Sequence, residues 1–321
     1  MNNPVFEALA EAARVAEPVT LGIICGVKGS SPQKVGAKAL FYADGRITGT
    51  LGGGCLEAEI QHRAIKALRT DRPSTFDLLL DHDFGWDDGL ICGGKVQGVI
   101  LPNAQRAGES FWRDLAQRRT PLAWGVRNDF SIQLLPAEVS RSRSGQTMSS
   151  TAIAESFYRE IIAPPGALWI AGAGHIAQAV APLALQLDFA VTVFDDRPAL
   201  ASRQFFPPAV ALQTDVWEKL LKVPLPPVPT FALIVTRGHR HDALVLRDWI
   251  HQPFLFVGMI GSARKARTIR EHFIEEHIAS PEQLERLACP VGIKIRSKSV
   301  MEIAVSIMAQ FIDKRAELAP Q

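Results

Sequence analysis

The sequence predicts an α/β protein of two domains: an N-terminal α/β domain of α+β character, then a Rossmann-like domain with a doubly wound parallel sheet. The first observation behind this prediction is a glycine turn, Gly172-Ala173-Gly174-His175-Ile176-Ala177, which follows the apolar run Ala167 to Ala171. A second apolar run, Ala190 to Phe194, ends in Asp195, 23 residues after Gly172. Strand, glycine turn, helix, strand and acid in this order are typical of a dinucleotide-binding unit. Because the turn begins past the midpoint of the 321 residues, we expect the upstream half to form a domain of its own.

Apolar patterns in the upstream half predict a mixture of helices and strands. An amphipathic helix is expected at Phe6 to Val15, and a later helix has Leu56, Ile60, Ala64 and Leu68 on one face. The turn Ala43-Asp44-Gly45 predicts a β-hairpin between the runs that flank it. In chain order, the expected strands are Val19 to Val27, Ala37 to Tyr42, Arg46 to Thr50, Phe76 to Leu80 and Val96 to Leu101.

The small, polar segment Ser140 to Thr151 is the best candidate for a linker, and Pro164-Pro165 cannot continue a helix. We therefore expect an N-terminal domain at 1–139, a linker at 140–165 and a Rossmann-like domain at 166–321. Beyond Asp195, strands and helices alternate, as they do in parallel sheets with helices on both faces. The expected strands are Ala209 to Leu212, Phe231 to Thr236 and Phe254 to Met259; the expected helices are Val216 to Leu221, Asp242 to His251, Ala263 to Ile278 and a last one with an apolar stripe from Val300 to Phe311.

Composition excludes several classes of function. The 35 basic and 33 acidic residues give a net charge of +2 without a basic stripe or tail, so nucleic acid is not an expected partner. The sequence contains no run of 18 uncharged apolar residues, so no membrane span is predicted, and the N-terminus lacks a signal-peptide pattern. We therefore expect a cytoplasmic protein. The four cysteines match no zinc spacing and are expected to be free thiols.

The glycine turn predicts a site for a phosphate or nucleotide. Gly172 permits the tight turn, Gly174 permits close approach of a phosphate to a helix N-terminus, and Asp195 is placed to accept a hydrogen bond from a ribose hydroxyl. His175 would add a donor and a titratable group. The alternative is a doubly wound domain that keeps the turn without the nucleotide, with His175 an ordinary surface or core histidine.

Two glycine loops of the upstream half carry cysteines. In Gly52-Gly53-Gly54-Cys55, successive N–H groups form a potential anion nest, and the helix N-terminus would lower the pKa of the Cys55 thiol. In Cys92-Gly93-Gly94-Lys95, backbone and thiol can both approach a ligand. A buried cysteine in a structural turn is the alternative for the first loop, and a hairpin with an incidental cysteine for the second. The acidic loop before Cys92 has no calcium-loop spacing, so we expect it to be solvated.

Two further loops follow predicted strands of the second half. After the strand that ends at Thr236, His239 and Asp242 are a candidate orienting pair, and a plain helix N-cap is the alternative for Asp242. After Met259, Gly261 and Ser262 precede a basic helix start that suits a phosphate. We expect Cys289-Pro290-Val291-Gly292 to be a structural turn.

Together these segments resemble the xanthine dehydrogenase accessory (XdhC/CoxI) family over nearly the whole chain. Gly172-Ala173-Gly174-His175 and the cysteine-bearing glycine loops are the specific matches. Arg296-Ser297-Lys298 departs from the family, many members of which have a second glycine pair there. The other matching stretches are Gly29-Ser30-Ser31-Pro32, Gly36-Ala37-Lys38, Asp195-Asp196-Arg197, Thr236 to Asp242, Gly258 to Ser262, Cys289 to Gly292 and Glu302 to Ile307.

The resemblance implies a maturation factor rather than a free-standing oxidoreductase. Such proteins bind molybdenum cofactor (molybdopterin or its dinucleotide form), secure its sulfurated state and deliver it to the apo-subunit of a xanthine dehydrogenase-like molybdenum hydroxylase. A cysteine desulfurase is an expected further partner and a homodimer the expected assembly. The implied site is shared between the two domains, with Cys92 or Cys55 at the metal end and with Gly172, Gly174 and His175 at the phosphate end, because soft thiolates suit a molybdenum–sulfur centre.

Two other functions stay open on the sequence. An NAD(P)-dependent oxidoreductase would place nicotinamide at the Gly172 turn, but no clear hydride-transfer residues accompany it. A non-catalytic nucleotide sensor would bind nucleotide and ignore pterin. The sequence leaves open whether a carried pterin has a phosphate or a dinucleotide tail.

Overall fold

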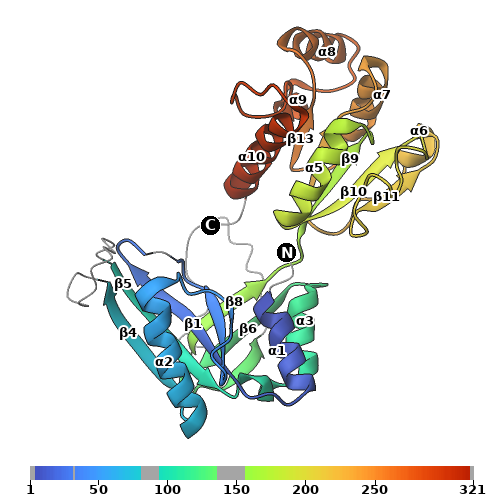
Figure 1. Ribbon diagram of the computed structural model, residues 1–321. Helices are drawn as coiled ribbons and strands as arrows, with labels where there is room; N and C mark the ends of the chain where they lie inside the picture. The colour runs from blue at the N-terminus through green and yellow to red at the C-terminus, as the bar shows by residue number, and fades with distance from the viewer. Residues whose placement is uncertain (1–3, 32, 81–93, 136–155, 319–321) are drawn as a thin grey trace. The chain divides into compact units, whose positions relative to one another are not determined.

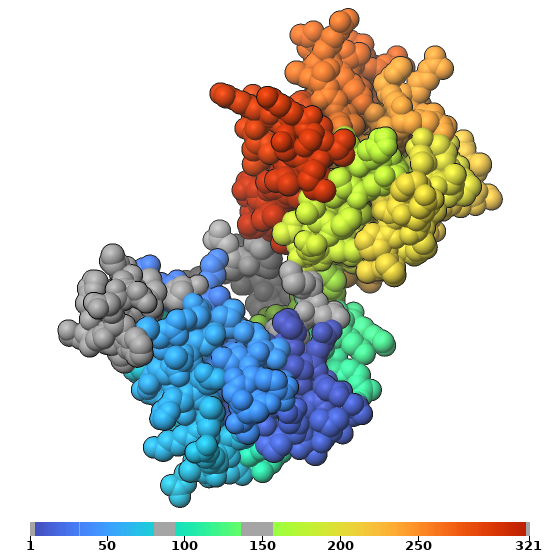
Figure 2. Space-filling model, viewed as in Figure 1, coloured from blue at the N-terminus to red at the C-terminus, as the bar shows by residue number. Residues whose placement is uncertain are grey.

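The structure, a computed structural model, describes residues 4–31, 33–80, 94–135 and 156–318. The chain divides into two compact units, one up to Pro164 and one from Pro165 onward. We call them the N-terminal unit and the Rossmann unit, and describe each by itself (Figure 1). In the space-filling view, the Rossmann unit, coloured yellow-green to red from Pro165 onward, packs as one body (Figure 2).

The N-terminal unit is built on a five-stranded antiparallel sheet of order β3-β2-β1-β5-β4. The predicted hairpin is present, since β2 pairs with β3 around the turn at Asp44 and Gly45. The strands are β1 (Val19–Lys28), β2 (Lys38–Tyr42), β3 (Ile47–Gly49), β4 (Ser74–Leu80) and β5 (Gly94–Pro102).

Both faces of this sheet are covered, so its central strand β1 is almost wholly buried at its start. On one face, α2 (Gly54–Thr70) packs Leu56, Ile60 and Ala64 against the sheet, as its apolar stripe predicts. On the other face lie α1 (Pro4–Arg14), the short 3₁₀ helix η2 (Ala104–Ala107) and α3 (Glu109–Gln117), whose aromatic and aliphatic side chains fill a second core.

A second sheet of order β7-β6-β8 completes this unit, with β6 (Leu122–Arg127), β7 (Ile132–Leu135) and β8 (Ser156–Ile162) all antiparallel. The predicted linker at 140–165 is therefore wrong over β8, which pairs with β6 through Tyr158↔Val126 and Glu160↔Trp124. Tyr158 and Ile162 are buried and Phe157 and Ile161 exposed, the alternation of a strand with one covered face. The elements η2, α3, β6 and β7 were not predicted from the sequence either.

The Rossmann unit confirms the predicted parallel sheet. Its six strands run parallel in the order β11-β10-β9-β12-β13-β14. Of these, β14 was not predicted. The strands are β9 (Gly166–Ala171), β10 (Phe189–Asp195), β11 (Ala211–Thr214), β12 (Thr230–Ile234), β13 (Phe256–Met259) and β14 (Leu287–Ala288). The helices are α5 (His175–Gln186), α6 (Trp217–Leu220), α7 (His239–Trp249), α8 (Ala263–Glu275), α9 (Pro281–Glu285) and α10 (Val300–Leu318).

Alternate residues of β9 enter two different cores, because successive side chains of a strand point to opposite faces. Leu168 and Ile170 pack with buried residues of α5 and α10. Trp169 and Ala171 pack with residues of α6, α7 and α8 on the other face. The sheet is thus covered on both sides, and its carboxyl edge is left for loops. None of the helices in the described part of the chain is long and apolar enough to cross a membrane.

Candidate functional site

The strand order changes direction between β9 and β12. From β9 the chain moves outward through β10 and β11, then returns to β12 on the other side of β9 and continues to β13 and β14. In open parallel sheets, ligands bind outside the carboxyl ends of the strands at such a switch point. The loops that follow β9 and β12 are therefore where a ligand site is expected.

Gly172 allows these two loops to touch. Its φ of +109° lies in the region that favours glycine, and its N–H donates to the Phe194 carbonyl over 2.8 Å. A methyl group added at Gly172 would lie 2.4 Å from the carbonyl oxygen of Val235 and 2.9 Å from Cα of Thr236. Gly172 is thus required by the close packing of the turn against the β12 loop.

Gly174 and Gly238 leave open space at the switch point. They are the N-caps of α5 and α7, and a Cβ at either position would meet nothing within 4 Å. Neither helix has a side-chain hydrogen bond capping its N-terminus, whereas the Ser262 hydroxyl at the start of α8 accepts from the Lys265 N–H. The first turns of α5 and α7 thus present N–H groups to a ligand, an arrangement suited to an anion. We call Gly174, Gly238 and these first turns the anion cradle.

His175 is the first residue of α5 and is exposed, next to the open position of Gly174. This agrees with a side chain that faces a ligand, and its predicted role as a donor stays a prediction.

Asp195 has a different task from the one expected. It is 1% exposed; its Oδ2 accepts from the Ala173 N–H over 2.6 Å, and its carboxylate also accepts from the N–H, Nε and Nη2 of Arg197 over 2.8–2.9 Å. Burial alone would raise the pKa of Asp195, but the hydrogen bonds from Arg197 and Ala173 outweigh it and lower the pKa. These four bonds use the acceptor positions of the carboxylate, so Asp195 braces the glycine turn and does not offer a free acceptor for a ribose hydroxyl.

Asp242 neither caps its helix nor pairs with His239. The N-cap of α7 is Gly238, and Asp242 is a buried residue of the first turn. Its Oδ1 accepts from the N–H and hydroxyl of Thr236 over 3.1 and 2.6 Å, and its Oδ2 contacts Nζ of Lys265 at 2.5 Å. His239 is exposed at the helix start. The Asp242 carboxylate thus ties the β12 loop to α8, through a lysine that was not predicted as its partner.

Gly261 and Ser262 lie where predicted, between β13 and α8, and Ser262 is the N-cap. A Cβ at Gly261 would lie 2.8 Å from Cδ of Lys265 and 3.0 Å from Sγ of Cys289, so this glycine serves close packing. Lys265 is already bound to Asp242 and to the Ile260 carbonyl. These contacts give the loop a structural role; phosphate binding by it stays a prediction.

The first cysteine-bearing loop has the backbone that its glycines predict. Gly52, Gly53 and Gly54 have φ values of +116°, +71° and +58°, and α2 begins at Gly54, so Cys55 lies in its first turn. The Glu57 carboxylate, in the first turn of α2, accepts from the hydroxyl of Thr50 and the N–H of Leu51, which braces the loop. A Cβ at Gly53 would meet nothing within 4 Å.

The second cysteine-bearing loop is described only from Gly94 onward; Cys92, Gly93 and the acidic loop before them lie outside the described residues. Gly94 is buried, and a Cβ there would lie 1.8 Å from the Ser30 carbonyl oxygen, so its Cα is covered by protein. We therefore assign Gly94 to packing rather than to a cofactor. Lys95 pairs with Asp77 at 2.8 Å.

Cys25, Cys55 and Cys289 are free thiols, as predicted. Burial raises the pKa of Cys25 to about 12 and also raises that of Cys289, so both stay protonated near neutral pH. Among the described residues, no group of three or more acidic, histidine or cysteine side chains is placed to hold a metal ion.

The N-terminal unit contains a buried lysine, Lys38, for which the sequence predicted no chemical role. Lys38 is 6% exposed; its Nζ contacts Glu160 at 2.7 Å, donates to the Gly36 carbonyl at 2.7 Å and lies 5.4–5.7 Å from three aromatic ring centres. Burial lowers the pKa of Lys38, and Glu160 opposes this change. The pair joins β2 to β8, and the motif Gly36-Ala37-Lys38 is thus a structural anchor.

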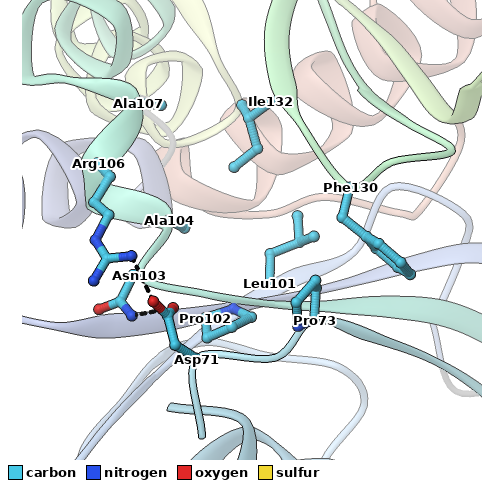
Figure 3. Close-up of a pocket in the computed structure, with 10 residues that line it drawn as sticks. All are labelled: Asp71, Pro73, Leu101, Pro102, Asn103, Ala104, Arg106, Ala107, Phe130 and Ile132. Atoms are coloured by element: carbon cyan, nitrogen blue, oxygen red, sulfur yellow. Dashed lines mark hydrogen bonds and ion pairs between the residues drawn. The ribbon is translucent and has the colours of Figure 1, made fainter.

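The N-terminal unit also holds a shallow cavity of about 250 Å³ (Figure 3). Its polar side chains satisfy one another, since the Asp71 carboxylate accepts from Asn103 and Arg106 over 2.6 and 2.8 Å. Asp71 follows α2, about 25 Å along the helix from Cys55. The cavity therefore includes none of the predicted site residues.

Fold and site together define a Rossmann-type protein with an anion cradle at its switch point and a separate domain upstream. Models of one family match both halves: the XdhC Rossmann domain matches residues 168–311, and the XdhC and CoxI family matches residues 12–80. The chain belongs to the XdhC and CoxI family.

Similar proteins extend over nearly the whole chain. A probable xanthine dehydrogenase subunit of Bacillus subtilis is 27% identical over 94% of this chain and 95% of its own. The molybdenum cofactor insertion chaperone PaoD of Escherichia coli is 23% identical over 97% of this chain and 88% of its own. A crystal structure from Bacillus halodurans, described as a xanthine dehydrogenase, matches with a TM-score of 0.79 and 25% identity over 99% of this chain and 97% of its own.

Proposed function

We propose that this protein binds molybdenum cofactor as cargo, secures its sulfurated form and delivers it to the apo-subunit of a molybdenum hydroxylase. The observation that carries the proposal is the anion cradle, where two glycine N-caps leave space for a phosphate at uncapped helix ends. Membership of the XdhC and CoxI family supports it, as does the similarity to a molybdenum cofactor insertion chaperone.

In this proposal the cradle holds the phosphate end of the pterin. N–H groups of the first turns of α5 and α7 donate to phosphate oxygens, and His175 supplies a further donor. Cys55, in the first turn of α2, and Cys92 are the thiols proposed for the molybdenum end, since thiolate is a soft ligand. Asp195 and Gly172 act indirectly, by holding the turn in place.

The partners follow from the same proposal: a molybdenum hydroxylase apo-subunit that receives the cargo, and a cysteine desulfurase that supplies sulfur. We propose that the protein acts in the cytoplasm, as a homodimer. The saturated acceptors of Asp195 do not favour an NAD(P)-dependent oxidoreductase, which remains an outcome of the test below.

The test is anaerobic purification from a cofactor-producing host, followed by release and fluorescence of oxidised pterin, for wild type, Gly174→Asp and Cys55→Ala. Gly174 has φ −76° and ψ −175°, which any residue can adopt, and Asp is a favoured N-cap. Gly174→Asp should therefore fold well while placing a carboxylate in the cradle. Ala43→Asp adds the same charge at an exposed hairpin turn and serves as control.

We expect near-stoichiometric pterin in wild type and Ala43→Asp, and its loss in Gly174→Asp. Loss in Cys55→Ala as well would support a thiol at the molybdenum end. Wild-type protein without pterin, or with bound NAD(P) in its place, would refute cofactor carriage.

A further inference from the structure

An ion pair spans the carboxyl end of β9. Asp196 follows β10, Arg237 follows β12, and these two strands lie on opposite sides of β9. The Arg237 guanidinium donates to both carboxylate oxygens of Asp196, over 2.9 and 3.3 Å. Neighbouring strands lie about 4.8 Å apart, so the two loops are roughly 10 Å apart and the pair must pass over the end of β9. We call it the Asp196–Arg237 bridge.

The bridge is part of a closed cluster of charges. Nη2 of Arg237 also contacts Nε2 of His241 at 2.8 Å, which holds the guanidinium from the side of α7. Arg197 binds Asp195 on both oxygens and lies 3.9 Å from Asp196. Two carboxylates and two guanidinium groups thus neutralise each other, and both acids at the end of β10 are engaged.

This cluster occupies the region that a nucleoside would need. In a Rossmann site that binds a dinucleotide, the acid at the end of the second strand binds the ribose, so the nucleoside lies near the ends of the first two strands. Here that acid is Asp195, whose carboxylate has no acceptor position left for a ribose. The Asp196–Arg237 bridge passes over the carboxyl end of the neighbouring strand β9. The anion cradle at Gly174 and Gly238 lies open beside it.

We propose that the Asp196–Arg237 bridge is a specificity device: it favours binding of a pterin whose tail ends in a phosphomonoester over binding of the dinucleotide form. The inference rests on the proposed function, because it names the form of the cargo that the same site takes. The phosphate binds at the cradle, and a second phosphate with its nucleoside must displace the Asp196–Arg237 bridge to bind.

The first measurement is the ratio of nucleoside monophosphate to oxidised pterin in acid hydrolysates of protein from a host that makes both forms of the cofactor. Wild type should release about fivefold less nucleoside monophosphate per pterin than Arg237→Ala. Arg237→Ala should release both. A stoichiometric nucleoside monophosphate in the wild type would overturn the proposal, and so would loss of all pterin in Arg237→Ala, since Arg237 would then be a phosphate ligand.

The second measurement is titration of the pterin-free protein with cytidine monophosphate as a probe of the nucleoside region. In wild type, cytidine monophosphate must break the Asp196–Arg237 bridge to bind, which costs about 1 kcal/mol. Arg237→Ala removes the bridge and should therefore bind cytidine monophosphate about fivefold more tightly. Arg247→Ala removes the same charge at an exposed position in the last turn of α7, away from the anion cradle, and should not tighten binding. Equal affinities in wild type and Arg237→Ala would overturn the proposal. Absence of pterin from wild type refutes only the proposed function, because this titration still decides the role of the bridge.

Discussion

Gly172 and Gly174 belong to the same turn but are glycines for different reasons, and alanine at each position separates those reasons. At Gly172 an alanine would keep φ near +109° and place its Cβ 2.4 Å from the Val235 carbonyl oxygen. Backbone strain of this kind costs about 1–3 kcal/mol and overpacking about another 1–3 kcal/mol. We expect Gly172→Ala to destabilise the Rossmann unit by about 4 kcal/mol.

At Gly174 the same change meets open space. Its φ of −76° suits alanine, and no atom lies within 4 Å of the added Cβ. A less favourable N-cap and a less flexible unfolded chain nearly offset each other, so stability should change by less than about 0.5 kcal/mol. The pair of variants thus differs in stability, although each adds one methyl group to the same loop.

The assay is thermal and urea unfolding of the full chain, with hydrogen exchange of the β9 and β12 peptides to assign the transition to the Rossmann unit. A loss of about 4 kcal/mol corresponds to a fall in Tm of roughly 8–16 °C for a unit of this size. Equal stabilities of Gly172→Ala and Gly174→Ala would refute the reasoning, since strain and contact with Val235 would then have no energetic weight.

Two further predictions concern the buried charges. Because folding lowers the pKa of Asp195, the unfolded chain binds more protons than the folded chain near pH 4. The stability that this carboxylate contributes is therefore present above about pH 4 and is lost as the pH falls through the lowered pKa. Urea unfolding of Asp195→Asn between pH 3 and 7 should show a loss of about 1–3 kcal/mol at pH 7 and a smaller decrease in stability in acid than wild type shows. Glu160→Gln leaves the Lys38 ammonium buried without its partner and should lower the free energy of unfolding by about 3 kcal/mol. Stability should recover as pH rises, because the pKa of Lys38 is already below its ordinary value and the ammonium loses its proton more readily in the folded chain. A Lys38→Met, Glu160→Gln double variant that is no more stable than Glu160→Gln would contradict this account.

Local sequence patterns predicted many of the helices and strands in both units. Apolar runs identified β9, β10 and β12 of the Rossmann unit, because strands covered on both faces are apolar throughout. In the N-terminal unit, the helical face at Leu56, Ile60 and Ala64 identified α2, because burial on one face imposes a period on the sequence. The same reasoning failed at β8, where a short alternation next to Pro164-Pro165 was taken for a connector. A strand of seven residues with polar neighbours has too weak a period to be separated from an extended loop.

The candidate site divides in a similar way. The glycines of the turn and of the loop before α2 were identified because special backbone conformations restrict the residue type. The partners of the charged side chains were not: Asp195 was expected to face a ribose, and Asp242 to face His239 or cap a helix.

The sequence by itself determined the fold class, the position of the Rossmann turn, the presence of helices after the glycine loops at Gly52–Gly54 and Gly172–Gly174, and the resemblance to one family. These depend on local period, local backbone freedom and residue type. Only the tertiary structure decided that Asp195 binds Arg197 and the turn, that Asp196 meets Arg237 across β9, and that Lys265 reaches Asp242. The hydrogen bonds and ion pairs of a buried carboxylate depend on which distant residues the sheet order brings to it. Spacing along the chain does not contain that information.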